Sequence, residues 1–447
     1  MPLLPATLPF VPEAAGLAIE NVTPDTTVRT RALILRGRST EATVRLKGAG
    51  KEVAFPVTDG RWAGIVNLKP GVNYVSAKGT GSSVRMKVTY RPMRTTHTVR
   101  AVYLLAADEV PGYIGNEKAG EADVRARFVT MLETIQAFTA EAMNDRGHGR
   151  KSFALATDAK GRVAVDFVRL PGTGSELRKK DGGTLYGEIY PVLASKYDFN
   201  TTKTIALMGF SRYHVPSRSA LGATALGGGG LALFGSVPIR FWPTGFPDIP
   251  RAFTDGRLVD PAVEADDSGL RGRAWANAAT TYGACLHELG HTLGLPHSPD
   301  RRCIMSRGFD GINRAWTLRE PIEGGAEKPV DPETRAHWDP AWAMRLDLSP
   351  WFQPDGPPTP TGDAPKVEIS GETATLSGTD LRVWGWWAEG PNFGVSQAQS
   401  RRLELSEGPN RAEVPIGELL KSLKSGEKLH LYLHDRFGRE TDVVANP

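Results

Sequence analysis

The 447-residue sequence predicts an α/β domain with a mixed sheet and one histidine-bearing helix, flanked by two small, sandwich-like all-β domains. Short strand-like segments separated by turn residues fill residues 18–92. Strands then alternate with long amphipathic helices over residues 97–352. The short-strand pattern returns over residues 367–447, after a stretch rich in proline and glycine. These changes of pattern predict three domains, which lies within the range of about two to four that the chain length suggests.

Residues 1–17 are a Pro/Ala-rich lead-in that lacks the basic and apolar regions of a signal peptide. Either the protein is not exported by that route or a leader has been removed, so a cytoplasmic and an extracytoplasmic location both stay open. Residues 18–92 follow as the first β domain. Turn sequences such as TDG and KPGVN separate its segments ATVRLKG, RWAGIVNL and SVRMKVTY, which predicts a β-sandwich.

The central domain, residues 97–352, is predicted to contain a sheet covered by helices. Apolar residues recur near helical spacing over 121–144, and a second long helix is expected over 273–293. Because the strands are interleaved with these helices, the sheet is expected to be mixed or mostly parallel. The predicted strands are 99–106, 153–158, 163–170, 202–210 and 229–236, and a helical pattern over 337–352 closes the domain.

Residues 353–366, QPDGPPTPTGDAPK, are predicted to be a linker because proline and glycine dominate them. The C-terminal β domain, residues 367–447, contains the segment VWGWWAEG. Strand alternation places its Trp384 and Trp386 on one face and Trp387 on the other. At least one face must belong to the core, so packing is the favoured interpretation. Binding of a glycan to exposed tryptophans is the alternative.

The charge balance argues against nucleic acid as a partner. The 54 basic residues nearly offset the 50 acidic ones, which leaves a net charge of +4. The longest uncharged stretch, residues 219–239, has the length of a membrane span, but its six glycines and one proline make a poor lipid-facing helix. We therefore expect a Gly-rich loop and strand there, and no membrane span.

Three of the nine histidines fall within CLHELGHTLGLPHSPDRRCIM, residues 285–305. On a helical wheel, His291 lies about 40° from His287, and Glu288 lies about 100° from it. Tyr282 and the leucines of the same helix fall on the opposite face. Histidines of the core would be expected among the leucines, so these two imidazoles are predicted to face a ligand instead.

The spacing H-E-x-x-H-x-x-G-x-x-H predicts a zinc site. Two imidazoles at positions i and i+4 can bind one zinc ion, which prefers nitrogen ligands in tetrahedral geometry. Glu288 lies beside this pair, where its carboxylate can take a proton from a water at the metal. A turn at Gly294 ends the helix and returns the chain to a third histidine. We therefore predict one catalytic Zn2+ ion held by His287, His291 and His297, with Glu288 as the general base.

This segment resembles the metzincin clan of zinc endopeptidases, and CIM (303–305) resembles its Met-turn, in which a methionine lies beneath the zinc. With IMSRGFDGINRAW, it is also similar to a family of zinc metallopeptidases of fungi and bacteria whose fungal members often carry a jacalin-like domain. The resemblance implies a metzincin-like zinc peptidase domain over residues 97–352. The residues that carry it are His287, Glu288, His291, Gly294, His297 and Met305.

The chain differs from some members of the clan at two positions near the third histidine and the methionine. Ser298 follows the third histidine and Arg307 stands two residues after the methionine, so the tyrosine ligand of some clan members is not expected. In the clan, a strand at the sheet edge pairs with extended substrate, and GGLALFGS (229–236) is the predicted strand. A buried strand without substrate contact is an equal alternative. Tyr213 and His214 are further candidate substrate contacts.

The two cysteines of the chain frame this segment, and neither is predicted to bind the metal. Cys285 lies about 160° from His287 on the wheel, at the margin of the apolar face. The Met-turn folds back near the active-site helix in the clan, which would allow a disulfide between Cys285 and Cys303. Two free structural thiols are the other interpretation, and the sequence leaves both open.

The sequence thus predicts a zinc metalloendopeptidase of metzincin type that acts on a polypeptide substrate. A zinc amidase with a non-peptide substrate is one alternative. An inactive peptidase fold that binds a partner, such as a glycan, through its β domains is another. The presence of Glu288 argues against the inactive form, because a protein without catalytic activity does not need a general base.

Overall fold

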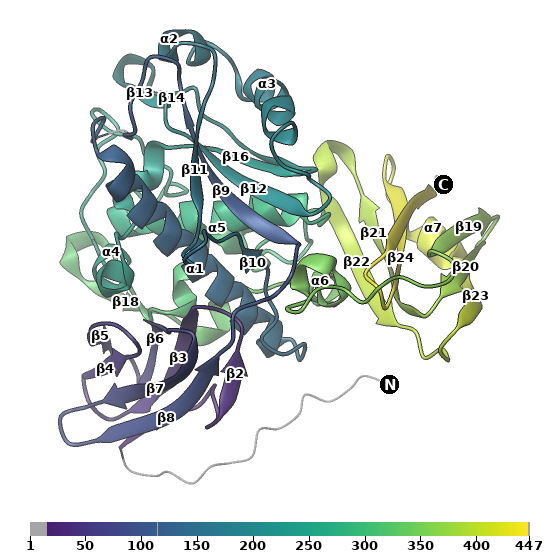
Figure 1. Cartoon of the computed structure of the whole chain (residues 1–447), viewed down its shortest axis with the longest axis horizontal. Coiled ribbons are helices and arrows are strands. Elements are labelled where there is room, and N and C mark those ends of the chain that lie inside the picture. Colours follow the sequence, from purple (N-terminus) through teal and green to yellow (C-terminus); the bar gives the residue numbers. More distant parts are fainter. Residues whose placement is uncertain (1–15, 114, 446–447) are drawn as a thin grey trace.

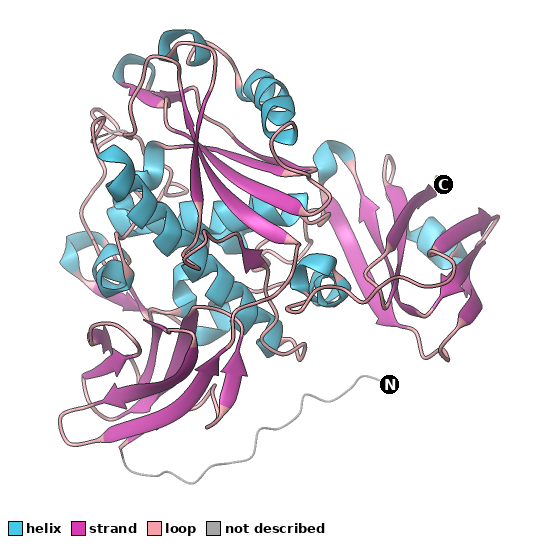
Figure 2. Cartoon of the chain, viewed as in Figure 1, coloured by secondary structure: helices cyan, strands magenta, loops and turns pink. Residues whose placement is uncertain are grey.

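The computed structural model describes residues 16–113 and 115–445 (Figure 1). The predicted lead-in, residues 1–17, therefore lies almost entirely outside the described residues. Strands dominate the first and last parts of the described chain, and the long helices lie between them (Figure 2). We call these parts the N-terminal unit (17–90), the central unit (98–352) and the C-terminal unit (366–445). The chain is a mixed α/β protein with several sheets, as its sequence predicts.

The N-terminal unit contains two sheets, with strand orders β1-β3-β6 and β2-β8-β7-β4-β5. In TVRLK of β4, the valine and leucine are buried and the polar residues are exposed, so one face of the sheet joins the core. The strands are β1 (Leu17–Ile19), β2 (Thr26–Val28), β3 (Ala32–Ser39), β4 (Thr43–Lys47), β5 (Val53–Pro56), β6 (Arg61–Asn67), β7 (Gly71–Lys78) and β8 (Ser83–Tyr90).

The central unit contains a six-stranded mixed sheet with the path β10-β9-β12-β16-β15, and β11 also pairs with β9. The pairs among β9, β10, β11, β12 and β16 are parallel, whereas β15 runs antiparallel to β16. The strands are β9 (Thr98–Leu105), β10 (Ala154–Leu155), β11 (Val165–Arg169), β12 (Thr202–Met208), β15 (Ala225–Gly228) and β16 (Leu231–Gly235).

The edge strand of this sheet differs from the one that the sequence predicts. Residues 229–236 supply β16, but β16 pairs with β12 on one side and β15 on the other, so it is an interior strand. GGLALFGS therefore does not form the edge, and the buried strand, which the sequence left equally open, is the one observed. Four consecutive glycines turn the chain here, with Gly229 at φ +53°, and the residues before the turn form the additional strand β15.

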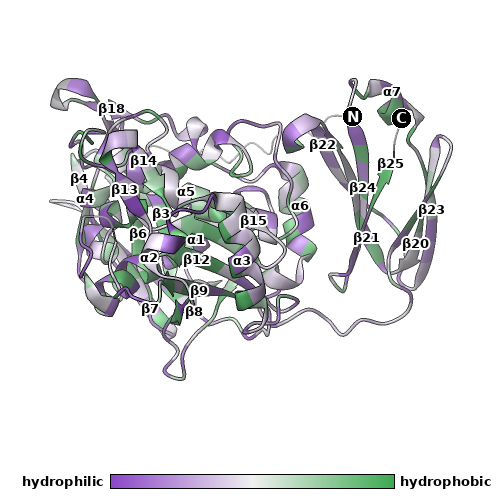
Figure 3. Cartoon of the chain, turned by 90° about the horizontal axis from the view of Figure 1, so that it is seen from above, coloured by the Kyte–Doolittle hydropathy of each residue, from purple (hydrophilic) through white to green (hydrophobic). Residues whose placement is uncertain are grey.

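The central strands are largely apolar (Figure 3), and their alternate residues pack on opposite faces of the sheet. Ala101 and Tyr103 of β9 belong to the core formed with α1 and α5, whereas Val102 and Leu104 pack with α3. Long helices therefore cover both faces, which explains why these strands are apolar throughout. The helices are α1 (Gly120–Asp145), α3 (Gly182–Ala194) and α5 (Ala274–Thr292).

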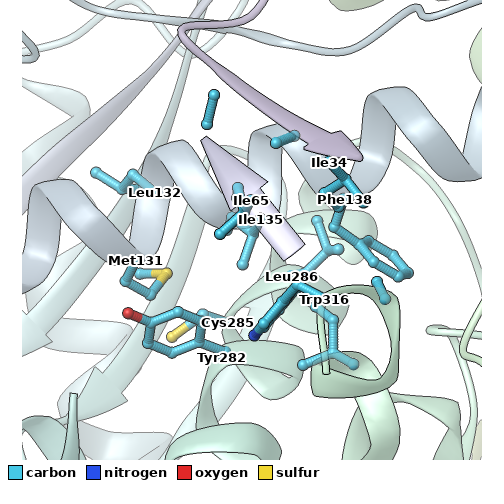
Figure 4. Close-up of a cluster of buried hydrophobic side chains, with 14 of the residues drawn as sticks. Ile34, Ile65, Met131, Leu132, Ile135, Phe138, Tyr282, Cys285, Leu286 and Trp316 are labelled. Carbon is cyan, nitrogen blue, oxygen red and sulfur yellow. The ribbon is translucent and has the colours of Figure 1, made fainter. Parts of the chain in front are cut away.

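The N-terminal unit and the central unit share one core (Figure 4). Ile34 of β3 and Ile65 of β6 lie close to Ile135 and Phe138 of α1, and Leu286 of α5 lies on the other side. All of these side chains are almost completely buried. The N-terminal unit therefore supports the helix that carries the histidines, through α1.

The C-terminal unit contains two antiparallel sheets, with strand orders β19-β20-β23 and β22-β21-β24-β25. Its second sheet lies against α6 (Pro340–Leu348), the last helix of the central unit (Figure 1). The elements are β19 (Lys366–Ser370), β20 (Thr373–Thr379), β21 (Leu381–Glu389), β22 (Val395–Arg402), β23 (Pro409–Pro415), α7 (Gly417–Ser422), β24 (Lys428–Asp435) and β25 (Glu440–Ala445).

The tryptophans of β21 are part of the packing, as their alternation predicts. Trp384 and Trp386 lie in the core of the C-terminal unit, whereas Trp387 packs on the opposite face in the core shared with the central unit. Each of the three is at most 8% exposed. Their rings therefore do not offer the exposed faces that stacking on a sugar requires.

Residues 219–239 form short strands and the beginning of a 3-10 turn, which confirms the predicted Gly-rich loop and strand. In the described part of the chain, no helix combines the length and the apolar character that crossing a membrane requires.

Candidate metal centre

The helix α5 presents the predicted metal ligands on one face and packs its other face into the core. Leu286 and Leu289 are fully buried, and Glu288 and His291 are partly exposed. Small residues are frequent in the first part of the helix, AWANAATTYGAC, so neighbouring segments can approach it closely. A Cβ atom on Gly283 would lie 2.0 Å from the carbonyl oxygen of Phe309, which shows how closely the loop after the motif crosses α5.

The end of α5 is a Schellman motif centred on Gly294. This glycine has φ +83°, and its N–H donates to the carbonyl of His291. The N–H of Leu295 donates to the carbonyl of Gly290, which completes the motif. The predicted turn at Gly294 is therefore confirmed, and glycine is needed there because the left-handed conformation is unfavourable for other residues.

The loop after this turn brings His297 next to the two helical histidines. Within the described residues, one ligand nitrogen from each of the three imidazoles lies within 4.8 Å of the others. Two hydrogen bonds brace the loop at Ser298: its N–H donates to the carbonyl of Met305, and its hydroxyl donates to Asp339. The sequence-predicted ligands are thus brought together by one helix and one braced loop.

Each of the three imidazoles forms a hydrogen bond between its Nδ1 atom and a backbone carbonyl. A carbonyl oxygen only accepts hydrogen bonds, so each Nδ1 atom must carry the proton. In the neutral ring, the lone pair then remains on Nε2, the atom available to a metal. The acceptors are the carbonyls of Ile304 for His287 (2.8 Å), Leu295 for His291 (2.8 Å) and Phe393 for His297 (2.9 Å).

The charge state of the helical histidines fits a metal site. Burial lowers the pKa of His287 to about 3 and that of His291 to about 4, and neighbouring imidazoles act in the same direction. Both rings are therefore neutral at physiological pH, the form in which histidine binds metal ions. Their Nε2 atoms lie 3.1 Å apart, and a bound cation would relieve the repulsion between two unprotonated nitrogen atoms at this distance.

Glu288 directly follows His287 on α5, and its backbone lies close to the edge strand. Burial raises the pKa of its carboxyl to about 7. Its backbone is in contact with Gly227 of β15, since a Cβ atom on that glycine would lie 2.3 Å from the Glu288 carbonyl oxygen. The edge strand and the helix therefore approach each other at the residue that follows the first histidine.

Replacing Gly227 with alanine is expected to lower the free energy of unfolding by about 1–3 kcal/mol, because the new methyl group meets the rigid backbone of α5. Gly228 is the matched control. A Cβ atom there would meet only the hydroxyl oxygen of Tyr186, at 3.5 Å. Denaturant unfolding of both variants checks this, and equal stabilities for Gly227→Ala and Gly228→Ala would contradict the close contact.

Met305 lies directly beneath α5. Its side chain is fully buried, and a Cβ atom on Gly290 would lie 2.3 Å from the methionine sulfur. Gly290 stands on α5 between the two helical histidines. The methionine therefore packs against the helix at the turn that carries the ligands.

Both cysteines of the chain are free and buried. Cys285 lies in the core with Tyr282 and Leu286 (Figure 4). The sulfur of Cys303 accepts hydrogen bonds from the N–H groups of Met305 (3.3 Å) and Asp339 (3.2 Å). The sequence left a disulfide and two free thiols open, and the structure shows two free thiols. The hydrogen bonds to the sulfur of Cys303 stabilise the turn before Met305.

We expect that the native protein does not react with a thiol reagent such as Ellman's reagent. In the unfolded protein, we expect two reactive thiols per chain. Burial raises the pKa of Cys303 to about 12 and that of Cys285 well above its ordinary value, so neither forms the reactive thiolate. The control is a parallel titration after reduction. Fewer than two thiols in unreduced, unfolded protein would indicate a disulfide instead.

The other candidate contacts lie outside the histidine group. His214 is exposed, and its Nδ1 atom contacts the hydroxyl of Ser217 at 2.6 Å. The hydroxyl of Tyr213 donates to the carbonyl of Pro261. His214 therefore makes a local contact in the hairpin that precedes β15, whereas Tyr213 joins this hairpin to the distant segment that contains Pro261.

A cavity of about 520 Å³ is lined by residues of the edge strand β15 and of α5. Thr224 and Ala225 line it from the edge-strand side, and Ala284 lines it from α5, one turn before Glu288. Phe309 joins it to the metal centre, because its ring packs edge-on against His287 with centroids 5.2 Å apart. The lining is mostly apolar, and its charged residues are Asp266, Asp267 and Arg307.

No sequence pattern points to one residue of this site, Phe393. Its segment GPNFG predicts a turn between two strands, but no pattern connects that turn with His297. The contact arises only because the C-terminal unit packs beside the central unit.

Comparison with known proteins places the chain in a family. A protein named putative zinc metalloproteinase from Schizosaccharomyces pombe is 25% identical over 395 residues, which cover 80% of this chain and 64% of that protein. A protein of the same description from Saccharomyces cerevisiae is 25% identical over 343 residues, which cover 67% and 49% of the two chains. The chain therefore spans about half to two thirds of the length of these relatives.

Among solved structures, OgpA from Akkermansia muciniphila aligns with a TM-score of 0.45 at 18% identity, covering 79% of this chain and 93% of that one. The sequence model of the family described as "Putative peptidase family" matches residues 17–380. This match begins in the N-terminal unit, contains the three histidines and Glu288, and extends into the C-terminal unit. Because it covers most of the sequence, the chain belongs to this peptidase family.

Proposed function

We propose that the protein is a zinc-dependent endopeptidase of metzincin type. In this proposal, His287, His291 and His297 hold one zinc ion and Glu288 is the general base. The observation that carries the proposal is the convergence of three imidazoles whose Nδ1 atoms all donate to backbone carbonyls. The names of the two fungal relatives agree with this chemistry.

In the proposed reaction, the residues of the chain position the metal and move the proton. Zinc, when bound, polarises the scissile carbonyl and makes water more acidic. The three carbonyl acceptors keep the imidazoles in the tautomer that leaves each Nε2 free. The carboxylate of Glu288 accepts a proton from the attacking water and then donates it to the amine nitrogen of the leaving peptide.

Met305 takes the role of the Met-turn methionine in this proposal. Its buried side chain supports the helical turn at Gly290 from below. A packed floor restricts movement of the ligand-bearing helix, so it keeps the imidazoles in position for the metal. The proposal also treats residues 18–92, 97–352 and 367–447 as three domains, with residues 353–366 as a linker.

We propose that a peptide substrate binds along the edge strand β15. This strand pairs with β16 on one side only among the described strands, so its other side can accept an extended peptide. Gly227 places the strand against the backbone of Glu288, so a peptide on this strand would lie near the proposed general base. The cavity beside Phe309 then offers a mostly apolar site for one substrate side chain.

The test combines metal analysis with cleavage-site profiling on a proteome-derived peptide library. The proposal expects one zinc ion per chain and cleavage at internal peptide bonds. Chelation should abolish cleavage, and added zinc should restore it. Hydrolysis of small amides without cleavage of any peptide would favour a zinc amidase. A zinc-loaded protein that hydrolyses neither class would overturn the enzymatic proposal.

A further inference from the structure

The C-terminal unit reaches the metal centre through the loop between β21 and β22. The loop, residues 390–394, closes on itself because the N–H of Gly390 donates to the carbonyl of Gly394. Within it, the carbonyl of Phe393 accepts the hydrogen bond from Nδ1 of His297. The two partners are 96 residues apart in the sequence, and the family match ends at residue 380, before the loop begins.

The backbone of this loop is held in an unfavourable conformation. Asn392 has φ 58° and Phe393 has φ 60°, both in the left-handed region. Asparagine is tolerated there, but a phenylalanine is uncommon. The phenylalanine ring is 71% exposed, so burial of the side chain does not compensate for the strain. Strained residues of this kind concentrate at functional sites, where the surrounding structure holds them in place.

The loop keeps its position because the C-terminal unit is anchored to α6. The hydroxyl of Ser400 donates to the carbonyl of Ala341, and Arg402 pairs with Asp347 at 2.8 Å. Arg345 of α6, whose side chain is only 5% exposed, pairs with Glu440 of β25. These contacts join two strands of the C-terminal unit, β22 and β25, to α6 of the central unit, so they fix the position of the whole C-terminal unit.

The same helix is tied to the loop that carries the third ligand. Asp339 caps α6 by accepting from the N–H of Ala341, and its other oxygen accepts from the hydroxyl of Ser298. Ser298 is the residue directly after His297. The backbone of His297 is thus fixed from the central unit, whereas its ring is fixed from the C-terminal unit.

We propose that the C-terminal unit is a structural part of the metal centre, with Phe393 as the positioning residue of His297. The proposal rests on the proposed function for the identity of the metal. The ring acceptors of His287 and His291 come from the motif segment itself, but His297 depends on Phe393. The C-terminal unit therefore contributes directly to metal affinity, and it is more than an appended binding module.

The test compares three full-length variants for zinc affinity, measured by competition with a chromogenic chelator. Phe393→Pro is incompatible with a positive φ and moves the carbonyl, so zinc affinity should fall about 10- to 100-fold. Phe393→Gly keeps both the carbonyl and the backbone conformation, so its affinity should remain unchanged. Gly371→Pro is the control, because it disturbs a left-handed hairpin position of the same unit with no neighbour within 4 Å.

Zinc affinity is measured without substrate, so the two proposals can fail separately. Wild-type affinity in a folded Phe393→Pro variant would overturn the role of Phe393 and leave the peptidase proposal intact. Reduced zinc affinity of Phe393→Pro, together with no peptide cleavage by the wild type, would support the role of Phe393 and overturn the peptidase proposal. An equal loss in Gly371→Pro would show that the effect is a general destabilisation, which also overturns the proposal.

A measurement on the metal-free wild-type protein decides the case in which Phe393→Pro does not fold. Nitrogen chemical shifts of the His297 ring, assigned by comparison with His297→Gln, report which ring nitrogen carries the proton. We expect the proton on Nδ1, because a carbonyl acceptor faces that atom. A mixture of both tautomers would show that Phe393 does not hold the ring and would overturn the proposal.

Discussion

Replacing Glu288 with glutamine is expected to lower kcat/KM for peptide hydrolysis by about 10²- to 10⁴-fold while zinc remains bound. Glutamine has nearly the same shape but cannot accept a proton from water. Glu288 is not among the converging ligands, so removal of its charge leaves the three imidazoles in place. The measurement is steady-state cleavage of a fluorogenic peptide, with zinc content determined on the same samples.

Glu121→Gln is the matched control for this variant. Glu121 stands in the first turn of α1, and its side chain is 60% exposed, so the same chemical change there should leave kcat/KM unchanged. Wild-type activity in zinc-loaded Glu288→Gln would rule out Glu288 as the base. Loss of zinc from Glu288→Gln would instead show that Glu288 is needed for the metal site itself.

The second large effect concerns the docking of the C-terminal unit. Glu440→Ala should lower the free energy of unfolding by about 2 kcal/mol, because it leaves the buried guanidinium of Arg345 without its partner. Loss of a partner from a fully buried pair costs about 3–5 kcal/mol. The smaller value applies because the Glu440 side chain is 27% exposed, which lets water reach the remaining charge.

Denaturant unfolding followed by tryptophan fluorescence measures this loss. The guanidinium of Arg345 lies over the rings of Trp387 and Tyr432, so undocking should change the tryptophan signal. Glu418→Ala is the control, because the Glu418 side chain is 92% exposed in its pair with Lys421 and exposed pairs contribute little. Equal stabilities of the two variants would show that the Arg345 pair does not hold the unit.

The contribution of the Arg345–Glu440 pair to the free energy of unfolding is expected to decrease at low pH. Burial acts to raise the pKa of Glu440, but Arg345 and His434 outweigh it and hold the pKa well below its usual range. A depressed carboxyl pKa stabilises the folded state above the unfolded-state value, about 4.3 for glutamate. The contribution is lost as the pH falls further. The stability difference between wild type and Glu440→Ala should therefore shrink below about pH 4.5.

The helical part of the site was predictable because its geometry is local. Positions i and i+4 of a helix lie on one face whatever surrounds them, so His287 and His291 had to be neighbours once the segment was helical. Gly294 was equally predictable, since the left-handed turn that ends α5 requires glycine. The same reasoning placed Trp384 and Trp387 on opposite faces of a strand, as observed.

The edge strand was not predictable from its own residues. The alternation and apolar character of GGLALFGS fit a buried and an edge position equally well. Whether a strand lies at an edge depends on whether another segment pairs with it. Here Ala225–Gly228 pairs with β16, and the run of glycines that allows the hairpin also obscured the strand in the sequence.

The sequence by itself determined the chemistry: three histidines, one carboxylate and a glycine at spacings that a single helix and turn convert into a candidate zinc site. Only the tertiary structure decided what surrounds that site. It placed β15 at the edge, kept Cys285 and Cys303 apart as free thiols, and set the carbonyl of Phe393 against His297. The physical reason is range: helix periodicity acts over a few residues, whereas contacts between distant segments depend on how whole units pack.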